Sequence, residues 1–414
     1  MNRKGKISNL KNNILSMLTL QGVNFIIPLI LLPILVNNLG NEKFGLLIFA
    51  QVFINYFNLL VNFGFDLSAT RQISIHRNND KRLSEIFYSV FFIRLILLLF
   101  SIILLYFILK YIDKFNEFQE IYWVTFISVI GQFLFPLWFF QGLEKMKYIT
   151  IINTLSKIFF LILTIILIKN EDDYIVAAYL YSFGFLTSGV FSIFLIYYKF
   201  PIKFLIPSKR KLRFYFLESL HFFLSRVSVS LYTSSNVFIL GLVSNYTVVG
   251  YYSIALKIYS ALQSLYITIS TALYPYMAKN KDVPLFKKLF IILVFINLFM
   301  VSIVYTFEVE LFKFLFNNYE QISIEIFNIL LLVSLISMAS ILLGYPLLAA
   351  LGYKKISNNS VIFGSFYHII ALFILYATNN LTIYTIAYLL VSTEILVLSV
   401  KLYAINKFVL IKRT

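Results

Sequence analysis

The chain has no cysteine among its 414 residues, and its only histidines are His76, His221 and His368. Disulfides and thiolate metal sites are therefore excluded, and histidines at unrelated positions do not predict a metal site. No cofactor is expected. Charged residues make up only 13% of the chain, about half the share usual in water-soluble proteins. Because 60% of the residues are hydrophobic, the solvent for most of the chain is predicted to be lipid.

The sequence also lacks the motifs of several membrane machines. It has no glycine-rich phosphate-binding loop, which argues against ATP-driven transport by this chain alone. No pair of carboxylates in a water-facing loop suggests a hydrolytic site, and no connection is long enough for the catalytic loop of a membrane polymerase. The chain is therefore not expected to be an enzyme. The net charge of +17 does not predict a nucleic-acid partner, because the basic residues form short runs between apolar segments, as membrane loops do.

The sequence instead contains many long apolar segments. A helix that crosses a bilayer needs about 20 mostly apolar residues, and about twelve segments qualify. They lie near residues 13–36, 43–66, 84–110, 118–141, 147–169, 174–198, 213–240, 247–275, 284–307, 322–351, 358–378 and 381–405. Most of the 35 Lys and Arg residues fall in connections on the side of the N-terminus. This distribution predicts an all-α membrane protein with both termini in the cytoplasm.

Two pairs of matching segments indicate an internal repeat. The stretch "FPLWFFQGLEK" (135–145) matches "YPLLAALGYKK" (345–355), and "FGLLIFAQVFINYFNLL" (44–60) matches "VGYYSIALKIYSALQSL" (249–265). The matches occur in the same order and in equivalent segments. They predict two bundles of about six helices each, residues 1–205 and 206–414, which repeat in parallel around an axis along the membrane normal.

A polar stripe follows the second segment. Steps of three and four residues place its members on one side of a helix; they are Gln51, Asn55, Asn58, Asn62 and Asp66. The matching segment of the second half carries Lys257, with Ser260 and Ser264 continuing the stripe. Two interpretations remain open. The amides and hydroxyls can join helices, each contact contributing about 0.6 kcal/mol, or they can line a hydrated cavity.

Several charged residues fall inside apolar segments. A cation near the middle of a bilayer costs at least about 2.5 kcal/mol, so it seldom faces lipid. The four cations are Arg94, Lys157, Arg226 and Lys257, and the acids at comparable depth are Glu218 and Glu394. For Arg94 alone, the alternative is a structural bond to Glu394 or to a backbone carbonyl. Because acids are too few to neutralise all four cations, we expect a water-filled cationic cavity between the bundles, suited to an anionic passenger.

Roles are also predicted for four other charged residues. Asp66 and Arg71, near the inner edge of the second segment, are predicted to form a gate or a structural ion pair. Glu218 and Glu394 are candidates to carry a coupling proton or to bind Na⁺.

The stretch "LGNEKFGLLIFAQVFINYFNLLVNFGFDLSATRQIS" (39–74) resembles the signature region of bacterial O-antigen and capsule repeat-unit flippases. These form the polysaccharide transport branch of the multidrug/oligosaccharidyl-lipid/polysaccharide (MOP) exporter superfamily. The segment "FFQGLEKMKYITIINTLSK" (139–157) is also similar. The resemblance implies a twelve-span fold like that of the MATE exporters, alternating access and a cationic lumen.

The same resemblance implies a substrate and partners. The substrate is an undecaprenyl-diphosphate-linked oligosaccharide, moved across the bacterial cytoplasmic (inner) membrane. Membrane lipid, a polysaccharide polymerase, a chain-length regulator and a coupling ion, H⁺ or Na⁺, are the further partners it suggests. The alternatives are a MATE-like, cation-coupled exporter of small molecules, a non-transporting structural subunit of a polysaccharide assembly complex, and a membrane polymerase. An exporter of cations should expose unpaired acids, whereas bases outnumber acids in these segments.

Overall fold

The computed structural model describes the backbone of residues 3–407, and the side chains from residue 22 onward except residues 24, 225, 228, 229 and 231–233. The chain divides into two compact units after Val227. The first unit contains α1 (Arg3–Asn62), α2 (Phe65–His76), α3 (Asp80–Tyr111), α4 (Asp113–Asn116), α5 (Gln119–Leu134), α6 (Leu137–Gly142), α7 (Met146–Leu167), η1 (Glu171–Asp173), α8 (Tyr174–Lys199) and the first part of α9 (Lys209–Val243).

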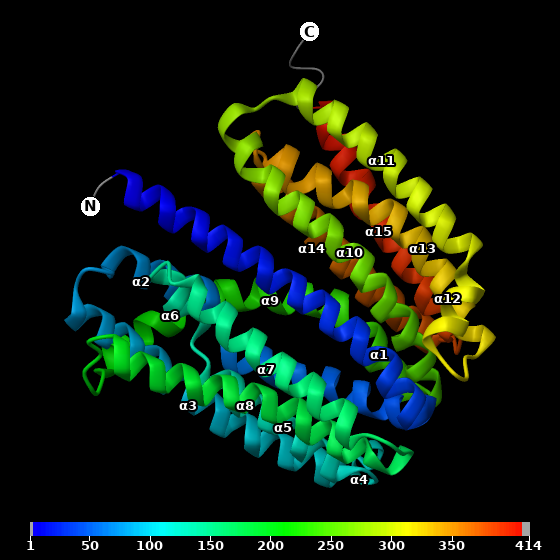
Figure 1. The fold of residues 1–414 in the computed structure, drawn as a ribbon, viewed down its shortest axis with the longest axis horizontal. Coiled ribbons are helices and arrows are strands. Elements are labelled where there is room, and N and C mark those ends of the chain that lie inside the picture. Colours follow the sequence, from blue (N-terminus) through cyan, green and yellow to red (C-terminus); the bar gives the residue numbers. More distant parts are fainter. Residues whose placement is uncertain (1–2, 408–414) are drawn as a thin grey trace. The chain divides into compact units, whose positions relative to one another are not determined.

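The second unit holds the rest of α9 and the helices that follow it. These are α10 (Tyr246–Asn280), α11 (Val283–Thr306), α12 (Glu308–Leu315), α13 (Gln321–Leu342), the π-helix η2 (Leu343–Ala349), α14 (Lys354–Ala377) and α15 (Ile383–Ile405). In this unit α13 packs against both α11 and α15, and α12 follows the end of α11 (Figure 1).

Every segment predicted from hydropathy overlaps a helix. Over the described residues, nine helical stretches are long and apolar enough to cross a membrane. Helix α1 supplies two of the predicted segments, because its backbone breaks at Gly40, where φ is 67° and ψ is 170°. Helices α9 and α10, with 35 residues each, are not among these nine stretches. The prediction of an all-α membrane protein is confirmed.

Small residues hold α5 and α8 together in the first unit. A Cβ added to Gly131 would lie 2.4 Å from the backbone carbon of Phe185, and one on Gly189 would lie 2.4 Å from the Gly131 carbonyl oxygen. The Ser182 hydroxyl donates to the Thr125 carbonyl at 3.3 Å. Close backbone approach through glycine and serine is a usual way for helices to associate in lipid. The pair forms a rigid base against which α1 and α7 pack.

The first part of α9 belongs to the first unit through polar contacts with α2. The Gln72 Nε2 donates to both carboxylate oxygens of Glu218, at 2.8 and 2.9 Å. The hydroxyls of Ser68 and Ser219 lie 2.5 Å apart. Compactness therefore divides the chain within α9, at Val227. The division into residues 1–205 and 206–414 concerns the internal repeat and stays a prediction.

Both units distort their helices at the matched prolines. In the first unit α5 ends at Leu134 and α6 starts after Pro136. In the second unit α13 continues directly into the π-helix η2, which contains Pro346. Proline removes a backbone donor, and in membrane helices local π adjustments re-satisfy the backbone groups that it frees. Beside η2, the Lys401 ammonium donates to the carbonyl and hydroxyl oxygens of Ser340, both at 2.9 Å.

Candidate functional site

A pocket in the first unit contains one of the four predicted cations. It has a volume of about 150 Å³ and lies among α1, α7 and α8. Its walls are mostly apolar, with Ile27 and Leu31 from α1 among them. Helix α7 contributes Asn153, Ser156 and Lys157 to the lining. We call this space the Lys157 pocket.

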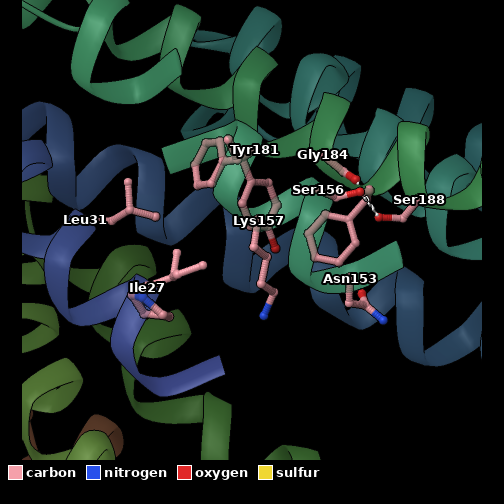
Figure 2. Close-up of a pocket in the computed structure, with 11 residues that line it drawn as sticks. Ile27, Leu31, Asn153, Ser156, Lys157, Tyr181, Gly184 and Ser188 are labelled. Carbon is pink, nitrogen blue, oxygen red and sulfur yellow. Dashed lines mark hydrogen bonds between the residues drawn. The ribbon is translucent and has the colours of Figure 1, made fainter. Parts of the chain in front are cut away.

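The polar groups of the Lys157 pocket divide into two sets. Ser188 on α8 donates to the Ser156 hydroxyl at 2.7 Å, so these two hydroxyls satisfy each other. Asn153 and Lys157 are four residues apart on one face of α7. Figure 2 shows their polar ends pointing the same way, away from the Ser156–Ser188 bond. The Asn153 amide donates one N–H to the Ile149 carbonyl at 3.1 Å. Its other N–H and its oxygen, beside the Lys157 ammonium, suit an anion or a hydroxyl-rich group.

Arg94 lies outside this pocket and is buried, with 2% of its surface exposed. Its Nη2 donates to the Asn62 side-chain oxygen at 2.8 Å and to the Gln132 carbonyl at 2.7 Å, and its guanidinium lies 5.6 Å from the centre of the Phe133 ring. A backbone carbonyl, one of the predicted alternatives, is therefore one of its partners. The guanidinium joins α1, α3 and α5, and its Nε has no partner among the described residues.

The other two predicted cations have different surroundings. The side chains of Arg226 on α9 and Lys257 on α10 are exposed. The charges of Arg94 and Arg226 both act on the Asp66 carboxylate, so the three groups share one electrostatic neighbourhood in the first unit. Lys257 belongs to the second unit. A single cavity lined by all four cations stays a prediction.

The polar stripe of α1 does not have one uniform environment. Gln51 is half-buried and Asn55 is exposed. Asn58 is buried, and its side-chain oxygen has no hydrogen-bond partner among the described residues. Asn62 is occupied by Arg94. The stripe therefore combines one helix-joining contact with amides that remain available.

In the second unit, Ser260 and Ser264 turn back to their own helix. Their hydroxyls donate to the carbonyls of Leu256 and Ser260, at 2.7 and 2.5 Å. Such bonds to the carbonyl four residues back satisfy the hydroxyl without a ligand. Because a hydroxyl oxygen still accepts, both positions keep an acceptor for a donor group.

The predicted acids also separate by environment. Glu218 is held by Gln72, whereas Glu394 is buried on α15. Asp66 and Arg71 lie on α2, and Arg71 is exposed. The two do not form an ion pair; the pairs found in the described part of the chain involve other residues. Of the two alternatives for Asp66 and Arg71, the ion pair is wrong and the gate stays a prediction.

A buried histidine network in the second unit was missed from the sequence. The His368 Nε2 lies 2.8 Å from the Asn236 side-chain oxygen, and its Nδ1 lies 2.8 Å from the Thr393 hydroxyl. Asn236 in turn donates to the Tyr252 hydroxyl at 3.1 Å. A lone histidine in an apolar segment gives no pattern that would reveal these partners, which come from three other helices.

Sequence relatives of the chain are named as transporters. A relative from Escherichia coli (strain K12), "Putative O-antigen transporter", is 31% identical over 267 residues, which is 64% of this chain and 64% of that protein. The match thus spans less than two thirds of the relative's length. A relative of the same description from Shigella dysenteriae is 29% identical over 375 residues, 88% of this chain and 92% of that protein. The expected likeness to O-antigen flippases is confirmed.

Solved structures resemble the fold. A lipid II flippase, MurJ in an inward closed conformation, has a TM-score of 0.77 at 16% identity and covers 95% of this chain and 87% of its own. An inward-facing MATE family transporter of the MOP superfamily has a TM-score of 0.70 at 16% identity and covers 95% and 99%. At this identity the likeness concerns the fold alone, and it confirms the expected MATE-like fold. Residues 10–281 match the family described as "Polysaccharide biosynthesis protein", and the chain belongs to that family.

Proposed function

We propose that this chain is a flippase that moves undecaprenyl-diphosphate-linked oligosaccharides across the bacterial cytoplasmic membrane. The observation that carries the proposal is the relative named as an O-antigen transporter whose match covers 92% of its own length. The multi-pass apolar helices are in keeping with it. During flipping the sugar and diphosphate would cross in a hydrated cavity between the bundles by alternating access, while the polyprenyl tail stays in lipid. No covalent bond is broken in this process.

The cations take two roles in this proposal. Lys157, Arg226 and Lys257 have side chains that are exposed or half-buried, so they are the groups that attract the diphosphate or acidic sugars. Arg94 is fixed by Asn62 and Gln132, and it adds positive potential from within the bundle instead of touching substrate. Charge-assisted bonds to phosphate are among the stronger polar contacts in proteins.

The amides supply contacts to the sugar. Asn153 lies beside Lys157, and Asn55 and Gln51 remain available on α1. Amide groups both donate and accept, which suits hydroxyl-rich molecules. Ser260 and Ser264 would add acceptors on α10.

The proposal also covers the orientation in the membrane, the coupling ion, the gate and the partners. Both termini would lie in the cytoplasm, as the distribution of basic residues predicts. Glu218 or Glu394 would carry the coupling proton or bind Na⁺, and Asp66 with Arg71 would form an inner gate. A polysaccharide polymerase and a chain-length regulator would act on the product at the outer face.

The proposal is tested by complementation in a strain that lacks its own flippase. We expect Lys157→Gln and the pair Arg226→Gln with Lys257→Gln to reduce surface polysaccharide roughly tenfold, which corresponds to about 1.4 kcal/mol. Lys313→Gln is the matched control, because Lys313 is an exposed lysine on α12. Normal display by both cavity variants, at protein levels equal to the control, would remove the cationic cavity from the proposal.

A MATE-like exporter of small molecules is the second candidate, since the fold match to a MATE transporter is close. A non-transporting subunit of an assembly complex is a third. Vesicles containing the purified chain separate the three. Movement of a labelled lipid-linked sugar identifies a flippase, movement of a small cationic dye identifies an exporter, and movement of neither favours the subunit.

A further inference from the structure

A second cavity lies in the second unit, among α11, α13 and α15. It has a volume of about 630 Å³ and is open on one side. Its polar lining consists of Ser302 from α11, Glu325 and Asn328 from α13, and three tyrosines, Tyr305, Tyr384 and Tyr388. We call it the Glu325 cleft. Among the residues whose side chains are described, no lysine, arginine or histidine lines it.

The Glu325 cleft presents acceptors that lack donors. The Tyr384 hydroxyl donates to one oxygen of Glu325 at 2.5 Å, which fixes the orientation of the carboxylate. The Asn328 amide donates to Glu308 at 3.1 Å, so the Asn328 oxygen faces no donor. The oxygen of Asn328, which lines the cleft, and the other oxygen of Glu308, which lies outside that lining, are buried without a hydrogen-bond partner among the described residues. A buried acceptor without a donor is costly, so a ligand that brings N–H groups would be favoured.

The charge around the cleft has one dominant sign. The helix ends and the connection beside it carry Glu308, Glu310, Glu320 and Glu325, against one basic residue, Lys313. Tyrosine rings attract cations through their faces and line sites for ammonium groups. A carboxylate that accepts from one tyrosine and shares a cleft with two others therefore points to a positively charged nitrogen compound.

The surroundings of the cleft indicate that the ligand has apolar chains. The apolar stretch of α11 is only 11% buried. Phe299 is 70% exposed, Ile303 43% and Leu332 50%, so an apolar surface continues from the cleft along α11 and α13. In a membrane protein such a surface faces lipid tails. Tyrosines at the ends of spans lie at the level of lipid headgroups.

We propose that the Glu325 cleft binds a phospholipid with a primary ammonium headgroup, of the phosphatidylethanolamine class. The ammonium donates to the Glu325 carboxylate and packs against the tyrosine rings. The hydroxyls of Ser302 and Tyr388, which line the same cleft, donate to the lipid phosphate. The acyl chains follow the exposed side of α11. This inference does not depend on the proposed function.

The test uses the purified full-length chain and two lipids with identical acyl chains, phosphatidylethanolamine and phosphatidylglycerol. Native mass spectrometry measures the lipid retained, and thermal unfolding measures the stabilisation by each lipid. We expect the wild type to retain phosphatidylethanolamine over phosphatidylglycerol by roughly three- to tenfold, the range of one ammonium–carboxylate contact with aromatic support. Glu325→Gln should abolish this preference, while its amide oxygen still accepts from Tyr384 and preserves the α13–α15 contact.

Two further variants keep the test decisive. Glu310→Gln removes an exposed carboxylate of α12 outside the cleft and should leave the preference unchanged. Tyr388→Leu leaves Glu325 and Tyr384 intact and should weaken the preference about threefold. Equal retention of the two lipids by the wild type, or an unchanged preference in Glu325→Gln, would overturn the proposal. Binding of soluble glucosamine in place of the lipid, with the same dependence on Glu325, would also overturn it.

Discussion

Each unit links three of its helices through a polar contact, but the two contacts differ in their chemistry. In each unit, the second, third and fourth predicted segments of that half of the chain meet in a polar contact. In the first unit this contact joins Asn62, Arg94 and Gln132. In the second unit the Tyr266 hydroxyl bonds the side chains of Asn297 and Ser334. One contact is built on a cation and the other contains only neutral groups.

This difference shows that linking these three helices does not require a charge. Neutral side chains do so in the second unit, and at a lower desolvation cost, since burying a cation is expensive even when it is hydrogen-bonded. We therefore expect the charge of Arg94 to have a use beyond packing. Its electrostatic influence on Asp66, together with that of Arg226, indicates that it shapes the potential of the first unit.

Replacing Arg94 should have the largest effect. Arg94→Met keeps the approximate volume but removes the charged donor from the Asn62 and Gln132 oxygens, and the Gln132 carbonyl keeps only the Phe135 N–H. We expect a loss of about 3 kcal/mol in stability, because bonds from charged donors contribute about 1.5–3 kcal/mol each. Thermal unfolding in detergent measures it. Arg94→Lys keeps the charge and should recover part of the stability and most of the transport. A Met variant as stable and active as the wild type would contradict a special role for this cation.

Lys401 tests the buried cation of the second unit. Lys401→Met removes the donor to both oxygens of Ser340, and we expect a loss of about 2 kcal/mol, again measured by thermal unfolding. Lys355→Met is the control, since Lys355 is exposed at the start of α14 and should change stability by less than about 0.5 kcal/mol. Equal stability of the two variants would show that Lys401 does not support the π-helix.

Asn297→Leu should have the smallest effect of the three. Tyr266 keeps its bond to Ser334 at 2.8 Å when Asn297 is replaced, so only one neutral contact is lost. We expect a cost of about 1 kcal/mol and unchanged transport. If Asn297→Leu were as damaging as Arg94→Met, the contrast between the charged and the neutral contact would not hold.

Hydropathy was sufficient to locate the spans, because lipid imposes length and apolarity on each helix separately. It did not reveal the break at Gly40 as a joint within one long helix, the π-helix at Pro346 or the short helix α12. These features depend on how neighbouring helices meet, and that information is not contained in any single segment.

The candidate site was predicted in part. Spacing alone placed Asn153 and Lys157 on one face of α7, and they line one pocket. Spacing did not predict that Asn62 would accept a hydrogen bond from Arg94 while Asn55 stays exposed. One sequence does not show which helix packs against each face of α1. Lys401 and His368 were missed for the same reason. Their partners lie at least 25 residues away in sequence.

The joint at Gly40 determines how motion can pass through the first unit. The two parts of α1 meet there without an intervening loop, Asn38 donates to the Ile168 carbonyl at 2.9 Å, and a Cβ at Gly40 would lie 3.0 Å from the Glu171 carboxylate. A hinge needs room for its backbone to rotate, and the contacts around Gly40 leave no such room. The two parts of α1 should therefore move as one body during transport. Spectroscopic labels placed on either side of Gly40 should keep a constant separation throughout a transport cycle.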